Sequence, residues 1–143
     1  MMAGARGVKV SDEARPKIGV LISGRGSNLQ ALIDAVSAGT LAADLRLVIS
    51  NCADAAGLAH AAAAGIETLV LPHRSYSSRA SFDRALVDAL KARDVAFVCL
   101  AGFMRLLGPE FCAAFPGAVL NIHPSLLPAF PGVDAQRQAL EHG

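Results

Sequence analysis

Short apolar runs alternate along the chain with segments whose apolar residues recur at helical spacing. The apolar runs predict five buried strands, at residues 17–23, 45–50, 66–71, 95–101 and 118–122. The segments between them predict four helices, at about 29–38, 55–64, 82–93 and 109–114, and residues 134–142 predict the start of another. This alternation is typical of the α/β class, in which helices cover both faces of a doubly wound, mainly parallel sheet.

Ligands of such sheets bind beyond the carboxyl ends of the strands, near the point where the strand order reverses. The informative residues should therefore follow Ser23, Ala101 and Ile122, at the ends of the first, fourth and fifth predicted strands.

The first of these segments is a glycine-rich turn, Ser23-Gly24-Arg25-Gly26-Ser27-Asn28, at the start of a predicted helix. Glycines let the backbone turn tightly, and the amides of a helix start favour an anion. Ser27 and Gln30 also have the spacing of a capping box. The dinucleotide fingerprint fails, because Leu29 stands where its third glycine would be. The turn therefore predicts a monophosphate site; a turn and helix cap alone is the alternative.

The other two segments carry an apolar loop and a polar pair. Ala101 to Leu107 is apolar except for Arg105, and either lines a pocket for a flat ring or belongs to the core. Asn121 and His123 are two residues apart, so both point to one face of an extended chain. An amide and an imidazole there suit a developing oxyanion, although a structural histidine is the plainer interpretation.

Composition limits the number of domains, the kinds of partner and the location that the sequence allows. The chain has 143 residues, 53% of them hydrophobic, which suits one domain after a leader of residues 1–16 that we expect to be disordered. A formal net charge of +1 argues against nucleic acid as a partner. Nothing in the sequence is long and apolar enough to predict a membrane span or a secretory signal. Three cysteines without a C-x-x-C spacing predict neither disulfides nor a metal site, and favour a cytoplasmic location.

Three blocks resemble the phosphoribosylglycinamide formyltransferase family: SGRGSNLQALIDA (23–35), LAGFMRLL (100–107) and NIHPSLLPAFPG (121–132). The resemblance extends over residues 18–143 and implies a Rossmann-like formyltransferase domain over 17–143. It also implies transfer of a formyl group from 10-formyltetrahydrofolate, as co-substrate, to the amine of glycinamide ribonucleotide in purine biosynthesis, without a metal.

The resemblance implies a role for each matching residue. Three would hold the ribonucleotide phosphate, six would contact the folate, and two would be catalytic, with Asn121 binding the formyl oxygen and His123 stabilising the oxyanion and supplying a proton. The phosphate residues are Gly26, Ser27 and Asn28; the folate residues are Arg79, Met104, Arg105, Leu106, Leu107 and Asn121.

Members of that family continue well past the position of Gly143, and the later part carries the aspartate that pairs with the histidine. We therefore expect the chain to be the N-terminal part of a longer protein and to have little activity by itself. The segment 133–136 also departs from the histidines that many members have there.

Formyltetrahydrofolate deformylase, methionyl-tRNA formyltransferase and a ribonucleotide-binding core without turnover are the alternatives. An uncovered sheet edge favours self-association, so a homodimer is one state to consider.

Overall fold

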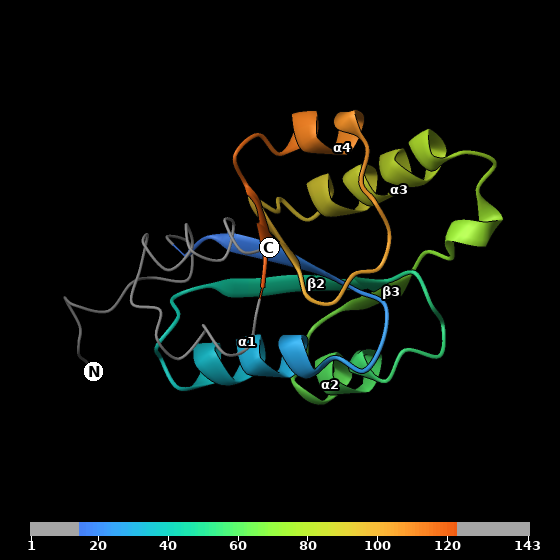
Figure 1. Ribbon diagram of the computed structural model, residues 1–143. Helices are drawn as coiled ribbons and strands as arrows, with labels where there is room; N and C mark the ends of the chain where they lie inside the picture. Colours follow the sequence, from blue (N-terminus) through green and yellow to red (C-terminus); the bar gives the residue numbers. More distant parts are fainter. Residues whose placement is uncertain (1–14, 123–143) are drawn as a thin grey trace.

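The computed structural model describes residues 15–122, which form a five-stranded parallel sheet flanked by helices (Figure 1). The strands are β1 (Lys17–Ile22), β2 (Asp44–Ser50), β3 (Thr68–Val70), β4 (Phe97–Leu100) and β5 (Val119–Asn121). The helices are α1 (Ser27–Ser37), α2 (Gly57–Ala63), α3 (Arg79–Lys91) and α4 (Pro109–Ala114), with a 3-10 turn η2 (His73–Ser75). The predicted α/β class is confirmed; the helix predicted at 134–142 lies outside the described residues.

The strand order is β3-β2-β1-β4-β5, with every pair parallel. Helices α1 and α2 cover one face of the sheet, and α3 and α4 cover the other (Figure 1). Successive side chains of β1 alternate between the two resulting cores, so Val20 and Ile22 face α1 and α2 while Leu21 faces α3 and α4. Because both faces are covered, β1 after Lys17 and the whole of β4 appear in the sequence as continuous apolar runs, whereas β2 begins with the charged residues Asp44 and Arg46.

The observed ends of one strand and two helices differ from the predicted ones. The strand predicted at 66–71 is limited to Thr68–Val70. The helix predicted from residue 55 begins at Gly57, whose N–H donates to the carbonyl of Gly24 at 3.0 Å. Helix α3 begins earlier than its apolar spacing indicates, because Ser78 and Ser81 form a capping box at its first turn.

The capping box predicted at Ser27 and Gln30 was wrong. Gly26 occupies the N-cap position in a left-handed conformation, with φ at 84°, and no side chain caps the helix. Ser27 is therefore already inside α1, and the Gln30 amide donates instead to Asp34 at 2.9 Å.

Candidate functional site at the carboxyl ends of the strands

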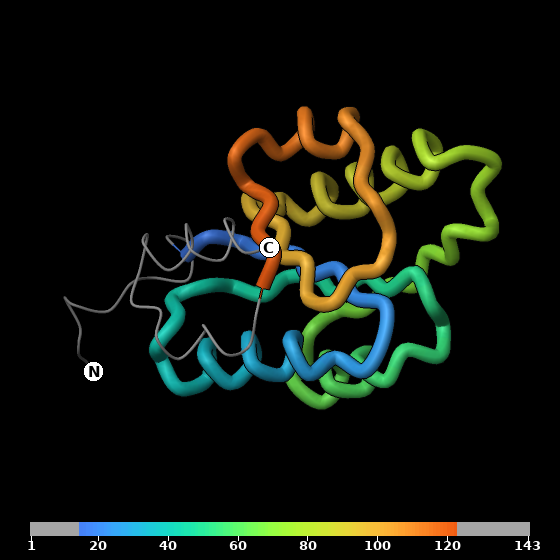
Figure 2. Tube along the Cα trace, in the orientation of Figure 1, coloured from blue at the N-terminus to red at the C-terminus, as the bar shows by residue number. Residues whose placement is uncertain are grey.

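Strands β1 and β4 mark the point where the strand order reverses. From β1 the chain turns into α1 on one face of the sheet, and from β4 it continues toward α4 on the other. The two loops border a cavity of about 350 Å³, lined by residues 23–28 and by Ala101, Gly102 and Met104. Figure 2 follows both loops along the chain. The position of this cavity matches the expected ligand site of a doubly wound sheet.

The turn over residues 24–28 is shaped by two glycines in close contact. Gly26 has a φ of 84°, and a Cβ on it would lie 2.4 Å from the Cα of Gly57. A side chain at residue 26 would therefore strain the backbone and collide with the start of α2. The first amides of α1 have no acceptor within the helix, and the positive end of the helix dipole adds to their attraction for an anion. This geometry suits an anion, and the phosphate site at this turn stays a prediction.

Asn28 ties this turn to the last described strand. Its side-chain amide donates to the carbonyl of Ile122 at 3.0 Å, so the carboxyl end of β5 is held against the start of α1. Asn121 is aligned with Leu100 of β4 and is half-buried. The structure thus brings Asn121 to the same edge as the turn, while His123 lies outside the described residues. With its side chain engaged, Asn28 would reach an anion through its backbone N–H.

The loop after β4 exposes three consecutive residues, 104–106, between two partly buried ones. Phe103 and Leu107 pack against the core under α3 and α4. Met104 is 80% exposed and Leu106 is 77% exposed, and Arg105 between them is exposed as well. Among residues 15–122, Met104 and Leu106 are the large apolar side chains most open to solvent. These two side chains form an exposed apolar surface on the loop beside the cavity.

A directed chain of hydrogen bonds links the ends of four strands. The backbone N–H of Met104 donates to Ser23 Oγ at 2.9 Å, so the hydroxyl proton is left to donate to Asn51 Oδ1 at 2.6 Å. Asn51 is buried, and its side-chain amide nitrogen lies 3.1 Å from Nδ1 of His73. The nitrogen of an amide only donates, so His73 accepts through Nδ1 and carries its proton on Nε2.

Desolvation, with smaller effects from the cations Arg105 and Arg74, lowers the pKa of His73 below its ordinary value of 6.5. The lowered pKa favours the neutral ring that this chain of hydrogen bonds requires. The sequence analysis did not single out His73. The one available signal was the position of Asn51 directly after β2 and of His73 three residues after the end of β3.

Arg79 on α3, which the sequence analysis assigned to folate binding, lies beside the far end of the loop between β4 and α4. It lines a cavity of about 320 Å³ together with Ala80, Asp83, Gly108, Pro109 and Glu110. Asp83 is 1% exposed, and its Oδ2 accepts from the N–H of Gly108 at 2.7 Å. Sequence reasoning missed Asp83, because a single acidic residue in a helix carries no signal of burial.

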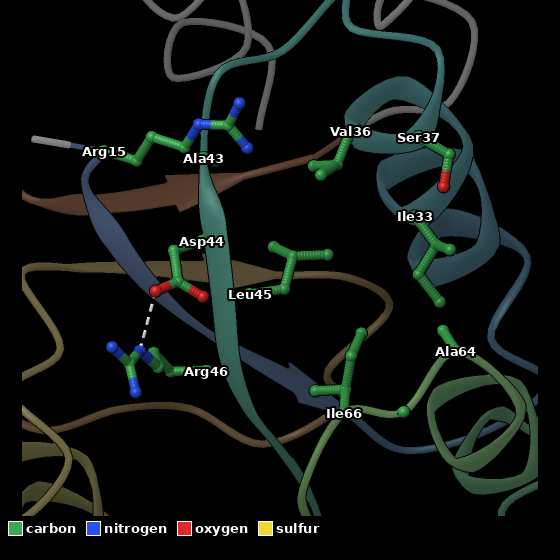
Figure 3. Close-up of a pocket in the computed structure, with 11 residues that line it drawn as sticks. Arg15, Ile33, Val36, Ser37, Ala43, Asp44, Leu45, Arg46, Ala64 and Ile66 are labelled. Atoms are coloured by element: carbon green, nitrogen blue, oxygen red, sulfur yellow. Dashed lines mark hydrogen bonds and ion pairs between the residues drawn. The ribbon is translucent and has the colours of Figure 1, made fainter. Parts of the chain in front are cut away.

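A larger cavity, of about 490 Å³, lies at the opposite edge of the sheet (Figure 3). The ends of α1 and α2 and the start of β2 surround it, and the Arg46 side chain beside it is paired with Asp44 at 2.8 Å. This cavity is remote from the carboxyl ends of the strands.

Burial raises the pKa of the Cys99 thiol to about 12, which makes that thiol inert near neutral pH.

Two kinds of feature are absent from residues 15–122. No group of three or more histidine, cysteine, aspartate or glutamate side chains within this span is placed to hold a metal ion. None of the helices in the same span has the length and apolarity needed to cross a membrane.

The sheet order and the switch-point cavity define an α/β ligand-binding protein of the Rossmann-like class. The sequence matches the formyl transferase family over residues 16–143, and the chain belongs to that family.

A relative with 50% identity over 124 residues is the phosphoribosylglycinamide formyltransferase of Escherichia coli (strain K12); the match covers 87% of this chain and 58% of the relative. The trifunctional purine biosynthetic protein adenosine-3 of Drosophila pseudoobscura pseudoobscura is 50% identical over 141 residues, which are 97% of this chain and 10% of that protein.

A solved structure shows the same fold. The crystal structure of glycinamide ribonucleotide transformylase 1 from Symbiobacterium toebii superposes with a TM-score of 0.76 at 49% identity, covering 99% of this chain and 66% of that one. The chain therefore spans a tenth of the Drosophila protein, 58% of the Escherichia coli enzyme and 66% of the Symbiobacterium toebii chain.

Proposed function

We propose that the protein to which this chain belongs transfers a formyl group from 10-formyltetrahydrofolate to the amine of glycinamide ribonucleotide. The observation that carries the proposal is the junction of two different surfaces at one switch point: an anion-favouring turn at Gly26 and an exposed apolar loop at Met104 and Leu106. A ribonucleotide phosphate fits the turn, and a flat folate ring fits the loop. Relatives named phosphoribosylglycinamide formyltransferase support the same assignment.

In the proposed reaction the substrate amine is the nucleophile. Its nitrogen attacks the formyl carbon, a new N–C bond forms, and the formyl oxygen becomes an oxyanion. Asn121, which ends β5 at the same edge, would donate a hydrogen bond to that oxygen. The bond from the formyl carbon to N10 of the folate then breaks, N10 gains a proton, and the amine loses one. His123, beyond the described residues, is proposed to deliver the proton.

Holding two substrates side by side supplies much of the rate gain in such a reaction, because it converts a bimolecular step into a step within one complex. Ser23 has a part in this arrangement, since its hydroxyl bonds the Met104 amide at 2.9 Å and so joins the phosphate turn to the apolar loop. Arg105 and Leu107 on that loop, and Arg79 on α3 beside its far end, remain proposed folate contacts.

A formyl-transfer assay with purified substrates tests the proposal. The assay follows the absorbance of the released tetrahydrofolate. It compares the 143-residue chain with a form lengthened at its C-terminus, and each form with its own His123→Ala variant. We expect turnover in the longer form that His123→Ala abolishes, and stabilisation of both forms by glycinamide ribonucleotide. Turnover with water alone as acceptor would favour a deformylase, and no stabilisation by the ribonucleotide would contradict the substrate assignment.

A further inference from the structure

The loop between β4 and α4 is held at two of its backbone amides by side chains from other elements. The N–H of Met104 donates to Ser23 Oγ at 2.9 Å, and the N–H of Gly108 donates to Asp83 Oδ2 at 2.7 Å. These contacts bracket the exposed residues Arg105 and Leu106. The first anchor comes from the phosphate turn; the second comes from α3, one helical turn after Arg79.

We propose that Asp83 is a positioning residue, which fixes the Met104–Gly108 loop in the shape that receives the folate. The inference rests on the proposed function. It assigns no contact between Asp83 and the ligand: the carboxylate acts through the Gly108 amide, and Met104 and Leu106 on the anchored loop meet the ligand.

The burial of Asp83 argues against a role in stability alone. Its side chain is 1% exposed, and Oδ1 is buried with no hydrogen-bond partner among residues 15–122. An unpartnered buried carboxylate oxygen is costly, and an apolar side chain of similar size would avoid the cost. A short, charge-assisted hydrogen bond to one loop amide is what the carboxylate supplies in return.

Gly108 supports the same conclusion from the other side of the contact. A Cβ on Gly108 would lie 2.7 Å from Asp83 Oδ2, although the φ of Gly108 is an ordinary −86°. The close approach of the carboxylate, rather than an unusual backbone conformation, is therefore what requires glycine at this position.

The test compares Asp83→Ala with Asp83→Asn and with Asp88→Ala, an exposed aspartate on the same helix. Amide hydrogen exchange reports the anchor, and titration calorimetry measures affinity for 10-formyltetrahydrofolate and for glycinamide ribonucleotide. We expect Asp83→Ala to speed exchange at Gly108 and to weaken folate binding by about tenfold, while ribonucleotide affinity stays the same. Asp83→Asn, which keeps an acceptor oxygen, should recover most of the folate affinity, and Asp88→Ala should change neither quantity.

Gly108→Ala provides a second variant if Asp83→Ala fails to fold, and it should weaken folate binding in the same selective way. Unchanged exchange at Gly108 in Asp83→Ala, or faster exchange with unchanged folate affinity, would overturn the positioning role. Absence of folate binding by the unaltered chain in its lengthened form would instead overturn the proposed function. An equal loss of affinity for both substrates would show general loosening of the fold, which also contradicts the proposal.

Discussion

Replacing Gly57 with alanine tests how closely α2 must pack on the turn over residues 24–28, the proposed phosphate site. A Cβ at residue 57 would lie 2.7 Å from Ile22 Cδ1 and 3.0 Å from the Cα of Gly26. Ile22 is fully buried, and Gly26 is backbone, so neither neighbour can withdraw freely. Ordinary contacts of this kind begin at 3.4 Å, which requires a displacement of at least 0.4 Å between α2 and the turn.

The expected effects on stability partly cancel. Alanine is a better helix former than glycine by at most about 1 kcal/mol, and overpacking costs about 1–3 kcal/mol. We expect a net loss of about 1–2 kcal/mol, measured by urea unfolding. The effect on binding should be larger in proportion, because a displaced turn weakens one or two hydrogen bonds to a charged phosphate. Each is worth about 1.5–3 kcal/mol, so affinity for glycinamide ribonucleotide should fall about ten- to hundredfold.

Gly65→Ala is the matched control, just beyond the other end of α2. Gly65 has a φ of 77° and open space around its Cα, so alanine there strains the backbone without a collision. It should lower stability by about 1 kcal/mol and leave ribonucleotide affinity unchanged. If Gly57→Ala bound the ribonucleotide as tightly as the unaltered chain, the close packing of α2 on the turn would not matter for binding and the reasoning would be refuted.

Three other substitutions probe separate parts of the structure. Phe111→Ala empties a fully buried site on α4 and should cost about 3–5 kcal/mol in urea unfolding; a loss below about 1 kcal/mol would contradict the packing. Asn28→Ala removes the bond to the Ile122 carbonyl and should cost about 1 kcal/mol, with faster amide exchange in β5 as its signature. Because the pKa of His73 is lowered, the unfolded chain gains a proton first as pH falls below 6.5, so thermal stability should decline as pH falls through and below this value. His73→Gln should flatten that decline, and an unchanged slope would refute the neutral, accepting role of the ring.

Much of the fold was predictable because it depends on local pattern. Largely apolar runs predicted strands covered on both faces, and the glycine-rich turn at residues 24–26 predicted the start of the first helix. The turn at residues 23–28 and the loop at residues 101–107 were expected at the same edge of the sheet, because the carboxyl ends of parallel strands share one edge, and both line one cavity there.

The remaining features depend on contacts between residues far apart in the chain. The Ser23 hydroxyl meets the Met104 amide, and the Asp83 carboxylate meets Gly108, only after α3 and β4 have packed. No spacing in the sequence encodes such pairs. The capping box was misplaced at Ser27 for a related reason: the contact between Gly26 and Gly57 fixes the left-handed conformation that starts the helix one residue earlier.

The central position of β1 has a consequence for synthesis on the ribosome. Strand β1 is made first, yet one of its two neighbours, β4, begins at Phe97, and the bond from Asn28 to Ile122 spans 94 residues. Until β4 arrives, one edge of an almost fully buried strand has no partner, and loop-closure entropy delays the pairing further. The nascent chain therefore passes through an interval in which this unpaired edge of β1 is open to aggregation, and the candidate site at the strand ends is among the last parts of residues 15–122 to form.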